Sequence, residues 1–177
     1  MNRFPLFFLP LLLLSSCATS EAEVSSVDHA AWRSSFLYPS QQGRFHFAGT
    51  PYPGGLEFAA SQGVTMVVDL RRDQELAQDG TPEREVVEAL GMKYRHLPVD
   101  PSRFGPMTAD RFDAIIAEES GPILVHCSTS NRAGGLWATW LARHGGETPQ
   151  AALDRGRSAG LRAGAMEQAV EAAMAAR

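Results

Sequence analysis

Cys127 and Arg132 are the residues of this chain whose types and spacing best suit nucleophilic chemistry. They lie in the segment His126–Arg132, between an apolar run typical of a buried strand and an apolar stripe typical of a helix. Where a short loop leads from a strand into a helix, backbone N–H groups and the helix dipole converge on one point and attract an anion. The same environment favours the thiolate form of a cysteine, which is its nucleophilic form. The sequence therefore predicts that Cys127 is a nucleophile at the floor of an anion site.

Arg132 and the loop before it are expected to bind that anion. A guanidinium group is a planar fork that holds two oxygens of a tetrahedral oxyanion at once, which a lysine cannot do. The loop residues Ser128, Thr129, Ser130 and Asn131 are predicted to contact the substrate. A cysteine at the end of a strand is often an inert core residue. The prediction that Cys127 is reactive therefore depends on the strand, loop and helix around it and not on the cysteine alone.

A general acid is needed to protonate the leaving alkoxide. Asp100 is the best placed by chain order, because it follows a strand predicted over residues 93–99. Its alternative role is that of a turn-forming Asp-Pro pair. Asp110 and Asp113 rank behind it, because both are explained as acidic residues in the first turn of a helix.

Several polar residues are expected to support the loop rather than to react. Asp69 ends a buried strand and is predicted to brace the site, while Arg71 is predicted to pair with Glu75, four residues further on. His126 is expected to orient the loop through a hydrogen bond. Neither a metal nor another cofactor is predicted, because metal-ligand spacing is absent from the remaining histidines, His29, His46, His96 and His144.

Alternating strand-like and helix-like segments predict how these residues are positioned. Strands are expected over 45–48, as an edge strand, and over 64–70, 93–99 and 123–125. Helices are expected over 54–62, 81–90 and 133–144, from 148, from 164, and over a segment capped by Thr108. The pattern predicts an α/β fold with a central, mostly parallel sheet of four to five strands flanked by helices. Cys127 then follows the last strand at its carboxyl end.

The N-terminus predicts export and a lipid anchor. Arg3 and the apolar stretch Phe4–Leu14 are typical of a signal peptide and too short to span a bilayer. Leu14–Cys17 resembles a bacterial lipobox, whose cysteine becomes the lipidated first residue. We therefore expect a signal peptide over 1–16, a lipid-anchored flexible tether over 17–31 and a single catalytic domain over 32–177. Ala18 favours the outer membrane, with the domain facing the periplasm; an ordinary secretory signal is the alternative.

Composition limits the partners. The chain of 177 residues has a formal net charge of −4 and no block rich in Lys or Arg, which argues against a nucleic-acid binder. The expected partners are a small anionic or phosphorylated substrate and, through the anchor, a membrane. The chain has 2 cysteines, and if Cys17 is lipidated then Cys127 has no disulfide partner in the chain.

Three segments resemble a known family in their order along the chain: Phe47–Pro51, Val67–Arg71 and His126–Arg132. Together they are similar to the phosphatase-like domains of bacterial beta-lactamase hydrolase-like proteins, which stand near the dual-specificity cysteine phosphatases. The resemblance covers residues 40–145. It implies an α/β domain in which Cys127 attacks phosphorus to form a thiophosphoryl enzyme that water hydrolyses, while Arg132 binds the oxyanion.

Two features depart from the usual phosphatase loop. Four residues separate Cys127 from Arg132, where tyrosine and dual-specificity phosphatases have five, and position 133 is Ala, where many have Ser or Thr to assist the departing thiolate. Four is the spacing of rhodanese sulfurtransferases, so a sulfurtransferase with a Cys127 persulfide is the first alternative. The second alternative is a phosphate- or sulfate-binding module that does not turn over.

Overall fold

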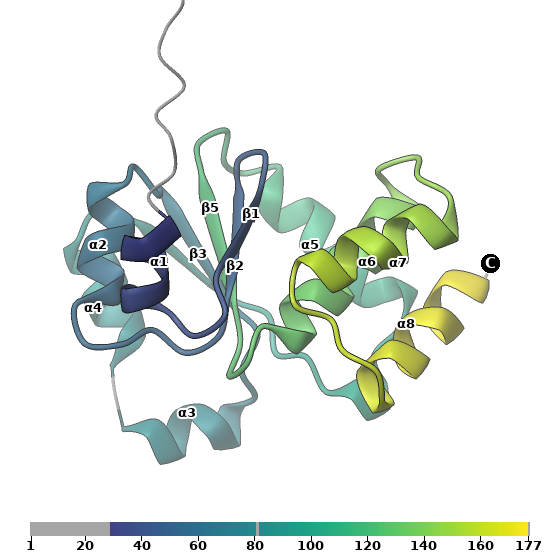
Figure 1. Cartoon of the computed structure of the whole chain (residues 1–177). Helices are drawn as coiled ribbons and strands as arrows, with labels where there is room; N and C mark the ends of the chain where they lie inside the picture. Colours follow the sequence, from purple (N-terminus) through teal and green to yellow (C-terminus); the bar gives the residue numbers. More distant parts are fainter. Residues whose placement is uncertain (1–28, 81, 177) are drawn as a thin grey trace, which may run out of the picture.

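A five-stranded sheet organises the computed structural model, which describes residues 29–80 and 82–176 (Figure 1). The strand order is β1-β2-β5-β3-β4; β1 runs antiparallel to β2, and all other neighbours are parallel. The strands are β1 (Ser40–Gln42), β2 (Phe45–Ala48), β3 (Met66–Asp69), β4 (Lys93–His96) and β5 (Ile123–His126). The predicted α/β fold with a mostly parallel sheet is confirmed.

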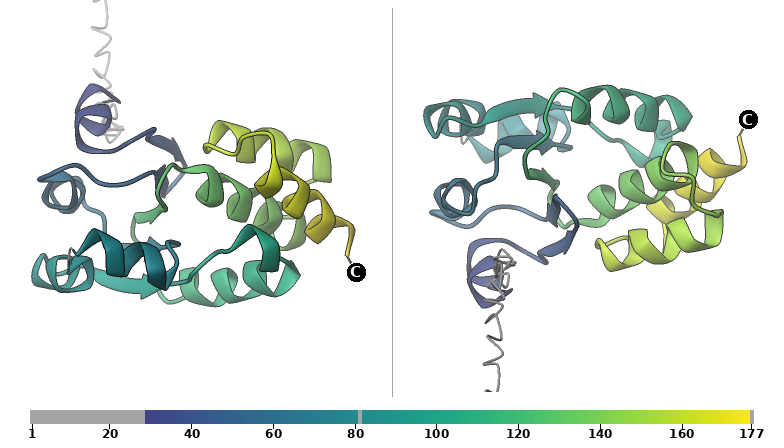
Figure 2. Two further views of the ribbon diagram at one scale, coloured as in Figure 1. Left: turned by 90° about the horizontal axis from the view of Figure 1, so that it is seen from below. Right: turned by 90° about the horizontal axis from the view of Figure 1, so that it is seen from above.

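Helices cover both faces of the sheet, as parallel connections require. Helices α1, α2 and α4 lie on one face, and α5 and α6 lie on the other, with α7 and α8 packed on α6 (Figures 1 and 2). Their bounds are α1 (His29–Ser35), α2 (Gly55–Ser61), α3 (Asp73–Asp79), α4 (Glu83–Ala89), the 3-10 helix η1 (Pro101–Arg103), α5 (Pro106–Ile116), α6 (Asn131–Arg143), α7 (Pro149–Ser158) and α8 (Ala165–Ala175).

Two apolar clusters fill the space on either side of the sheet. Successive side chains of a strand point to opposite faces, so in β3 Met66 and Val68 join the cluster under α5 and α6, while Val67 joins the one under α1 and α2. The three central strands β2, β5 and β3 are buried along their whole length. Such two-sided burial is typical of a parallel sheet, and it makes the carboxyl ends of these strands a rigid base for the loops that follow.

The prediction that residues 45–48 form an edge strand is wrong. Strand β2 lies between β1 and β5, and all four of its residues are buried. Its residue alternation suggested one solvent-facing side, but His46 stacks on the ring of Trp32 in α1 with 4.3 Å between the ring centroids. The edge is instead the short polar strand β1, which carries no apolar residue that could mark it in the sequence.

Helix α5 begins before its predicted cap. Gly105 occupies the N-cap and Pro106 the first helical position, which suits a residue without an N–H group. Thr108 lies inside the first turn, where its N–H donates to the carbonyl of Gly105 at 2.9 Å. The cap prediction for Thr108 is therefore wrong, although the helix itself is present.

The described part of the chain starts with α1, whose first residue His29 lies three residues before the predicted domain start at 32. The predicted signal peptide and Cys17 lie outside the described residues. Within residues 29–80 and 82–176, no helix has the length and apolar character needed to cross a membrane.

Candidate active site

The loop between β5 and α6 is held in place through its carbonyl groups. The carbonyl of Ser128 accepts hydrogen bonds from both the N–H and the hydroxyl of Thr50, each at 3.2 Å. The carbonyl of Thr129 accepts one from Arg162 Nη2 at 3.0 Å. Gly49 passes so close that a Cβ atom there would lie 2.9 Å from the Ser128 carbonyl oxygen. The loop backbone is therefore fixed from outside, and only a glycine fits at position 49.

The N-terminus of α6 has no capping side chain. Ser130 occupies the N-cap with φ at +66°, a left-handed conformation that a serine seldom adopts. Its hydroxyl donates to the carbonyl of Ala159 at 3.0 Å instead of capping the helix. The first N–H groups of α6 are thus left without a side-chain acceptor, and together with the helix dipole they favour an anion at the loop.

Arg132 directs its guanidinium fork at a carboxylate. Its Nη1 and Nη2 atoms donate to the two oxygens of Glu75 at 2.8 and 2.6 Å. The Ser128 hydroxyl donates to the same carboxylate at 2.6 Å. Arg132 Nη1 also bonds the carbonyl groups of Leu70 and Val99, at 3.3 and 3.2 Å. The guanidinium is therefore anchored to the segments that follow β3 and β4. The carboxylate of Glu75, an anion of the protein itself, already occupies the donors that are predicted to bind substrate.

Glu75 remains charged in this position. The hydrogen bond from Arg132 is the largest of several effects that hold the pKa of Glu75 well below its usual range. Arg72 adds two hydrogen bonds to the same carboxylate, from its backbone N–H at 2.9 Å and its Nε at 2.8 Å. The predicted pair of Arg71 with Glu75 is wrong: Glu75 binds Arg72 and Arg132, while Arg71 turns into the protein toward Asp69.

Helix α3, which carries Glu75, is attached through polar contacts. None of its residues is buried, and in Figure 1 it stands apart from the two helical layers. Glu75 ties its first turn to Arg132, and Asp79 at its last position binds Arg71 with an N–O distance of 2.7 Å. Since none of its residues is fully buried and only Leu76 is a half-buried apolar one, α3 is held over the loop mainly by these polar contacts.

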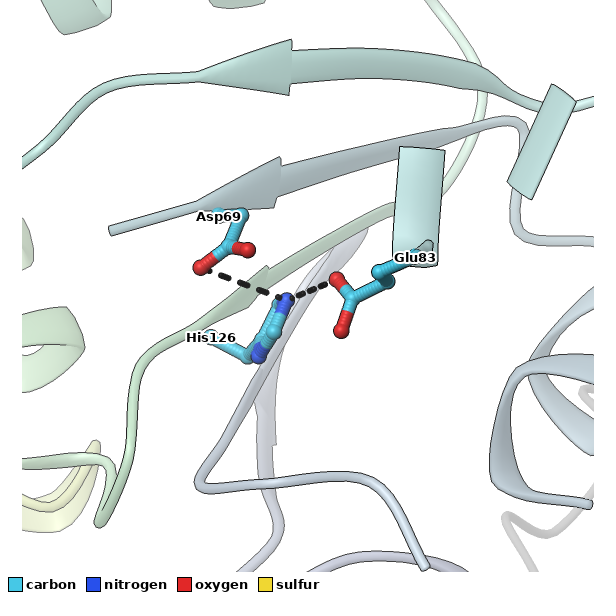
Figure 3. Close-up of side chains that lie close together, drawn as sticks. All are labelled: Asp69, Glu83 and His126. Carbon is cyan, nitrogen blue, oxygen red and sulfur yellow. Dashed lines mark hydrogen bonds and ion pairs between the residues drawn. The ribbon is translucent and has the colours of Figure 1, made fainter. Parts of the chain in front are cut away.

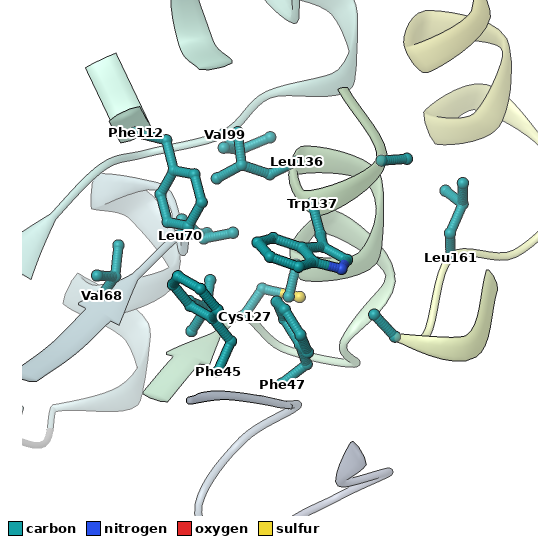
Figure 4. Packing of buried hydrophobic residues seen from close by; sticks show 14 of the residues in the cluster. Phe45, Phe47, Val68, Leu70, Val99, Phe112, Cys127, Leu136, Trp137 and Leu161 are labelled. Carbon is teal, nitrogen blue, oxygen red and sulfur yellow. The ribbon is translucent and has the colours of Figure 1, made fainter. Parts of the chain in front are cut away.

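Cys127 lies beside Arg132 and is covered. Its side chain is 0% exposed and belongs to the larger apolar cluster, near Phe47 and Leu70 (Figure 4). Burial lowers the pKa of Arg132, but the hydrogen bond to Glu75 and the neighbouring Cys127 sulfur outweigh it and raise that pKa. The structure thus brings together the cysteine and arginine that the sequence pairs, with the sulfur closed off from solvent.

A buried ionic network supports the loop from below. Arg71 binds Asp69 at 2.7 Å and also Glu83, whose other oxygen bonds His126 Nε2 at 2.7 Å (Figure 3). The hydroxyl of Tyr94 donates to Asp69 at 2.9 Å. These contacts join the carboxyl ends of β3 and β5 to the start of α4. The side chains of Asp69 and His126 thus join this network and not the loop itself, and their predicted supporting roles stay predictions.

Asp69, Glu83 and His126 form the one cluster with metal-ligand geometry among the described residues. Their ligand atoms lie within 4.8 Å of one another. However, the Arg71 guanidinium donates to both carboxylates. Burial lowers the pKa of His126, but the charges of Glu83 and Asp69 outweigh it and raise that pKa. Because Arg71 and a protonated His126 neutralise the carboxylates, the cluster is a closed ion-pair network rather than an open set of donors.

The candidate acids lie in different surroundings. Asp100 directly follows Val99, whose carbonyl bonds Arg132, and its carboxylate accepts two hydrogen bonds from Ser102, at 3.0 and 2.8 Å. It thus caps η1, which is the turn role foreseen as its alternative. Asp110 binds Arg143 and His144, and Asp113 accepts from Trp140 Nε1 at 2.8 Å. Those two contact the far end of α6 and not the loop.

Comparisons with known proteins agree with this architecture. The family model for the phosphatase-like domain of beta-lactamase hydrolase-like protein matches residues 48–144. A beta-lactamase hydrolase-like protein of Agrobacterium fabrum is 30% identical over 104 residues, which are 58% of this chain and 24% of that protein. The chain thus spans about a quarter of that relative.

Solved structures share the fold. A candidate phosphatase of Neisseria meningitidis z2491 superposes with a TM-score of 0.64 at 20% identity, covering 76% of this chain and 96% of its own. A candidate phosphatase of Shewanella putrefaciens CN-32 gives 0.59 at 21% identity, with coverages of 73% and 84%. Kinase associated phosphatase gives 0.60 at 14% identity, with coverages of 71% and 83%. At these identities the likeness concerns the fold.

Proposed function

Since the chain belongs to the family of phosphatase-like domains of beta-lactamase hydrolase-like proteins, we propose that it is a cysteine-dependent phosphatase with Cys127 as nucleophile. One observation carries the proposal: beside the buried thiol, Arg132 and Ser128 already hold the carboxylate of Glu75. A phosphoryl group offers the same kind of acceptor oxygens with more charge, and a guanidinium fork binds it in the same bidentate manner. The site is built to hold an anion next to a sulfur.

The reaction proceeds in two steps. The Cys127 thiolate attacks phosphorus, the bond from phosphorus to the leaving alkoxide breaks, and a thiophosphoryl enzyme forms while Arg132 holds the phosphoryl oxygens. Water then attacks phosphorus, which releases inorganic phosphate and restores the thiolate. The loop Ser128–Asn131 binds the oxygens during both steps. Because position 133 is a buried alanine without a hydroxyl group, we expect the second step to be the slower one.

Asp100 is the proposed general acid. It follows the Val99 carbonyl that Arg132 binds, so a short movement of this segment brings its carboxyl group to the leaving oxygen. The hydrogen bonds from Ser102 keep the pKa of Asp100 below its ordinary value. Asp100 therefore has to leave Ser102 in order to hold and donate a proton.

Substrate entry requires Glu75 to leave. Cys127 is fully covered, and the donors of Arg132 and Ser128 are engaged with the Glu75 carboxylate. A phosphoryl group that reaches the sulfur displaces this carboxylate. Helix α3 is a segment that can move at low cost, because none of its residues is fully buried.

Turnover by the full chain tests the proposal. Phosphate release from p-nitrophenyl phosphate is measured for wild type, Cys127→Ser, Arg132→Lys and, as a control at an exposed position on α5, Arg111→Lys. We expect no turnover in Cys127→Ser, a loss of about a hundredfold in Arg132→Lys because the bidentate contact is removed, and no change in the control. Mass spectrometry after acid quenching should find a phosphoryl adduct on wild type and on the Arg111→Lys control, and none on Cys127→Ser.

The same experiment separates the alternatives. The four-residue spacing favours a sulfurtransferase as second candidate, and a sulfur adduct on Cys127 after thiosulfate treatment, without phosphate release, supports it. A phosphate-binding module without catalysis binds phosphate in Cys127→Ser, loses it in Arg132→Ala and forms neither adduct.

Export and anchoring at Cys17 are further proposals that rest on the N-terminal sequence alone. Through this anchor the domain is placed in the periplasm, at the outer membrane, where its substrate is a phosphorylated molecule. Metabolic labelling with palmitate tests the anchor: we expect labelled wild type in the membrane fraction and unlabelled Cys17→Ser outside it. Label retained in the variant excludes Cys17 as the anchor.

A further inference from the structure

A basic groove lies beside the loop, between α1 and the connection from α7 to α8. Its volume is about 600 Å³, and the described residues that line it include no Asp or Glu. Its lining is distinguished by exposed arginines and tyrosines, namely Arg33, Tyr38, Tyr52, Arg157 and Arg162. The chain as a whole has a net charge of −4. The groove is therefore a local concentration of positive charge on a protein that is acidic overall.

Arg162 connects this groove to the loop. Its Nη2 atom donates to the Thr129 carbonyl at 3.0 Å, and its backbone N–H donates to Asn131 Oδ1 at 2.8 Å. Its guanidinium also stacks over the ring of Tyr38, 4.5 Å from the ring centroid. The groove thus begins where the loop ends. A ligand that is bound by the loop and is longer than a phosphate group has this groove as a neighbouring surface.

The charge in the groove is available to a ligand. Neither Arg33 nor Arg162 forms an ion pair with any residue in 29–80 or 82–176, whereas Arg157 is paired with Asp154 and Glu167. An exposed arginine without an acidic neighbour keeps its full charge for a partner. Among the described residues, the groove therefore offers two guanidinium groups without an ion-pair partner, of which Arg162 also donates one hydrogen bond to the loop.

The aromatic side chains add a contact surface. Tyr38 is 58% exposed and Tyr52 is 42% exposed, so two of the three large exposed apolar side chains of the described chain line this groove. Tyr38 is held with φ at +49°, which a bulky residue seldom adopts. Exposed tyrosines and arginines together are the residue types enriched in surfaces that bind polypeptides.

We propose that the basic groove binds an acidic polypeptide segment next to the phosphorylated residue of a protein substrate. The inference rests on the proposed phosphatase function and names its substrate class. Carboxylates of the segment complement Arg33 and Arg162, and its apolar groups contact Tyr38 and Tyr52. A small phosphate ester fills the loop and has no part that reaches the groove, so the two kinds of substrate respond differently to the groove residues.

Two phosphopeptides of equal length test this, one with Asp and Glu beside the phosphorylated residue and one with Asn and Gln there. At low salt we expect the full chain to favour the acidic peptide in kcat/KM by about tenfold, as two exposed ion pairs allow. Arg33→Glu should remove most of this preference through KM and leave turnover of p-nitrophenyl phosphate unchanged. Arg111→Glu, an equal charge change on α5, should leave the preference intact.

Binding to Cys127→Ser separates the groove from the chemistry. If the acidic peptide binds more tightly and Arg33→Glu abolishes this difference, the groove proposal is supported. If the wild-type chain at the same time releases no phosphate from any substrate, the phosphatase proposal is refuted. Hydrolysis of both peptides with equal kcat/KM, or an equal loss in Arg111→Glu, overturns the groove and leaves the phosphatase standing. Displacement of the bound peptide by an acidic polysaccharide but not by polyglutamate also overturns the polypeptide assignment.

Discussion

Replacing Glu75 by glutamine tests whether the internal carboxylate competes with phosphate for the loop. Glutamine has nearly the same shape and keeps one acceptor oxygen, but it lacks the charge that Arg132 binds. In the native chain that charge is held by two contacts from Arg132, one from Ser128 and two from Arg72, all between 2.6 and 2.9 Å. The substitution therefore weakens the internal ligand while the donors that receive phosphate stay in place.

The size of the effect follows from the exposure of the pair. A hydrogen bond to a charged group contributes about 1.5–3 kcal/mol when it is well buried. The side chain of Arg132 is 12% exposed and that of Glu75 is 21% exposed, so solvent screens part of this. Allowing for screening and for the contact that glutamine retains, we expect a net change of about 1–2 kcal/mol. The dissociation constant for inorganic phosphate should then fall by about fivefold to thirtyfold.

Isothermal titration of inorganic phosphate into the Cys127→Ser chain, with and without Glu75→Gln, measures this change without turnover. Asp73→Asn is the matched control, because it removes one negative charge from the same helix at a side chain that is 85% exposed. The control should bind phosphate like the parent. Phosphate affinity that is unchanged or weaker in Glu75→Gln would show that Glu75 positions Arg132 rather than competing with substrate, and the reasoning would be wrong.

Three further predictions concern the scaffold. Arg71→Met removes the cation that binds both buried carboxylates and should lower the free energy of unfolding by about 3–5 kcal/mol in urea titration. The raised pKa of His126 means that its protonation stabilises the fold fully below pH 6.5 and that this contribution is lost as pH rises through the folded-state pKa. Between about pH 6 and about pH 9, stability should therefore fall more in wild type than in His126→Gln. Gly134→Ala places a Cβ 2.3 Å from the Leu161 nitrogen and should cost about 1–3 kcal/mol in thermal unfolding. Gly105→Ala, with nothing within 4 Å and φ outside the left-handed region, should not.

The fold was predictable from the sequence where hydrophobic pattern and burial coincide. Strands β3 and β5 are unbroken apolar runs, and α6 has a wide apolar stripe, so their type and order follow from periodicity. The hydrophobic pattern does not predict an element whose residue types are not selected by burial. Strand β1, Ser40–Gln42, has the composition of a loop, and α3 is mostly polar and exposed, with Leu76 as its one half-buried apolar residue.

The site was predictable as a loop and not as a network. Cys127 and Arg132 lie on one short segment, so local spacing is enough to pair them. Glu75 lies 57 residues from Arg132 in the chain, and no local pattern connects two positions that far apart. The one sequence signal for Glu75 is that an acidic residue follows the segment Val67–Arg71. The four-residue spacing typical of helical ion pairs assigned it to Arg71. In the structure, Arg71 instead points into the protein and binds two buried carboxylates.

The two ends of α3 connect the loop to the network beneath it. Glu75 binds Arg132 at the loop, while Asp79 binds Arg71, which also neutralises Asp69 and Glu83. A phosphate group that displaces Glu75 breaks the contacts of one end only, and the other end stays fixed to a buried cation. Because no residue of α3 is fully buried and Leu76 is its only half-buried apolar side chain, such a movement of its first turn exposes little apolar surface, and most of its cost lies in polar contacts that phosphate replaces. The arrangement therefore allows the loop to open for an anion while the ionic network that supports Cys127 keeps its geometry.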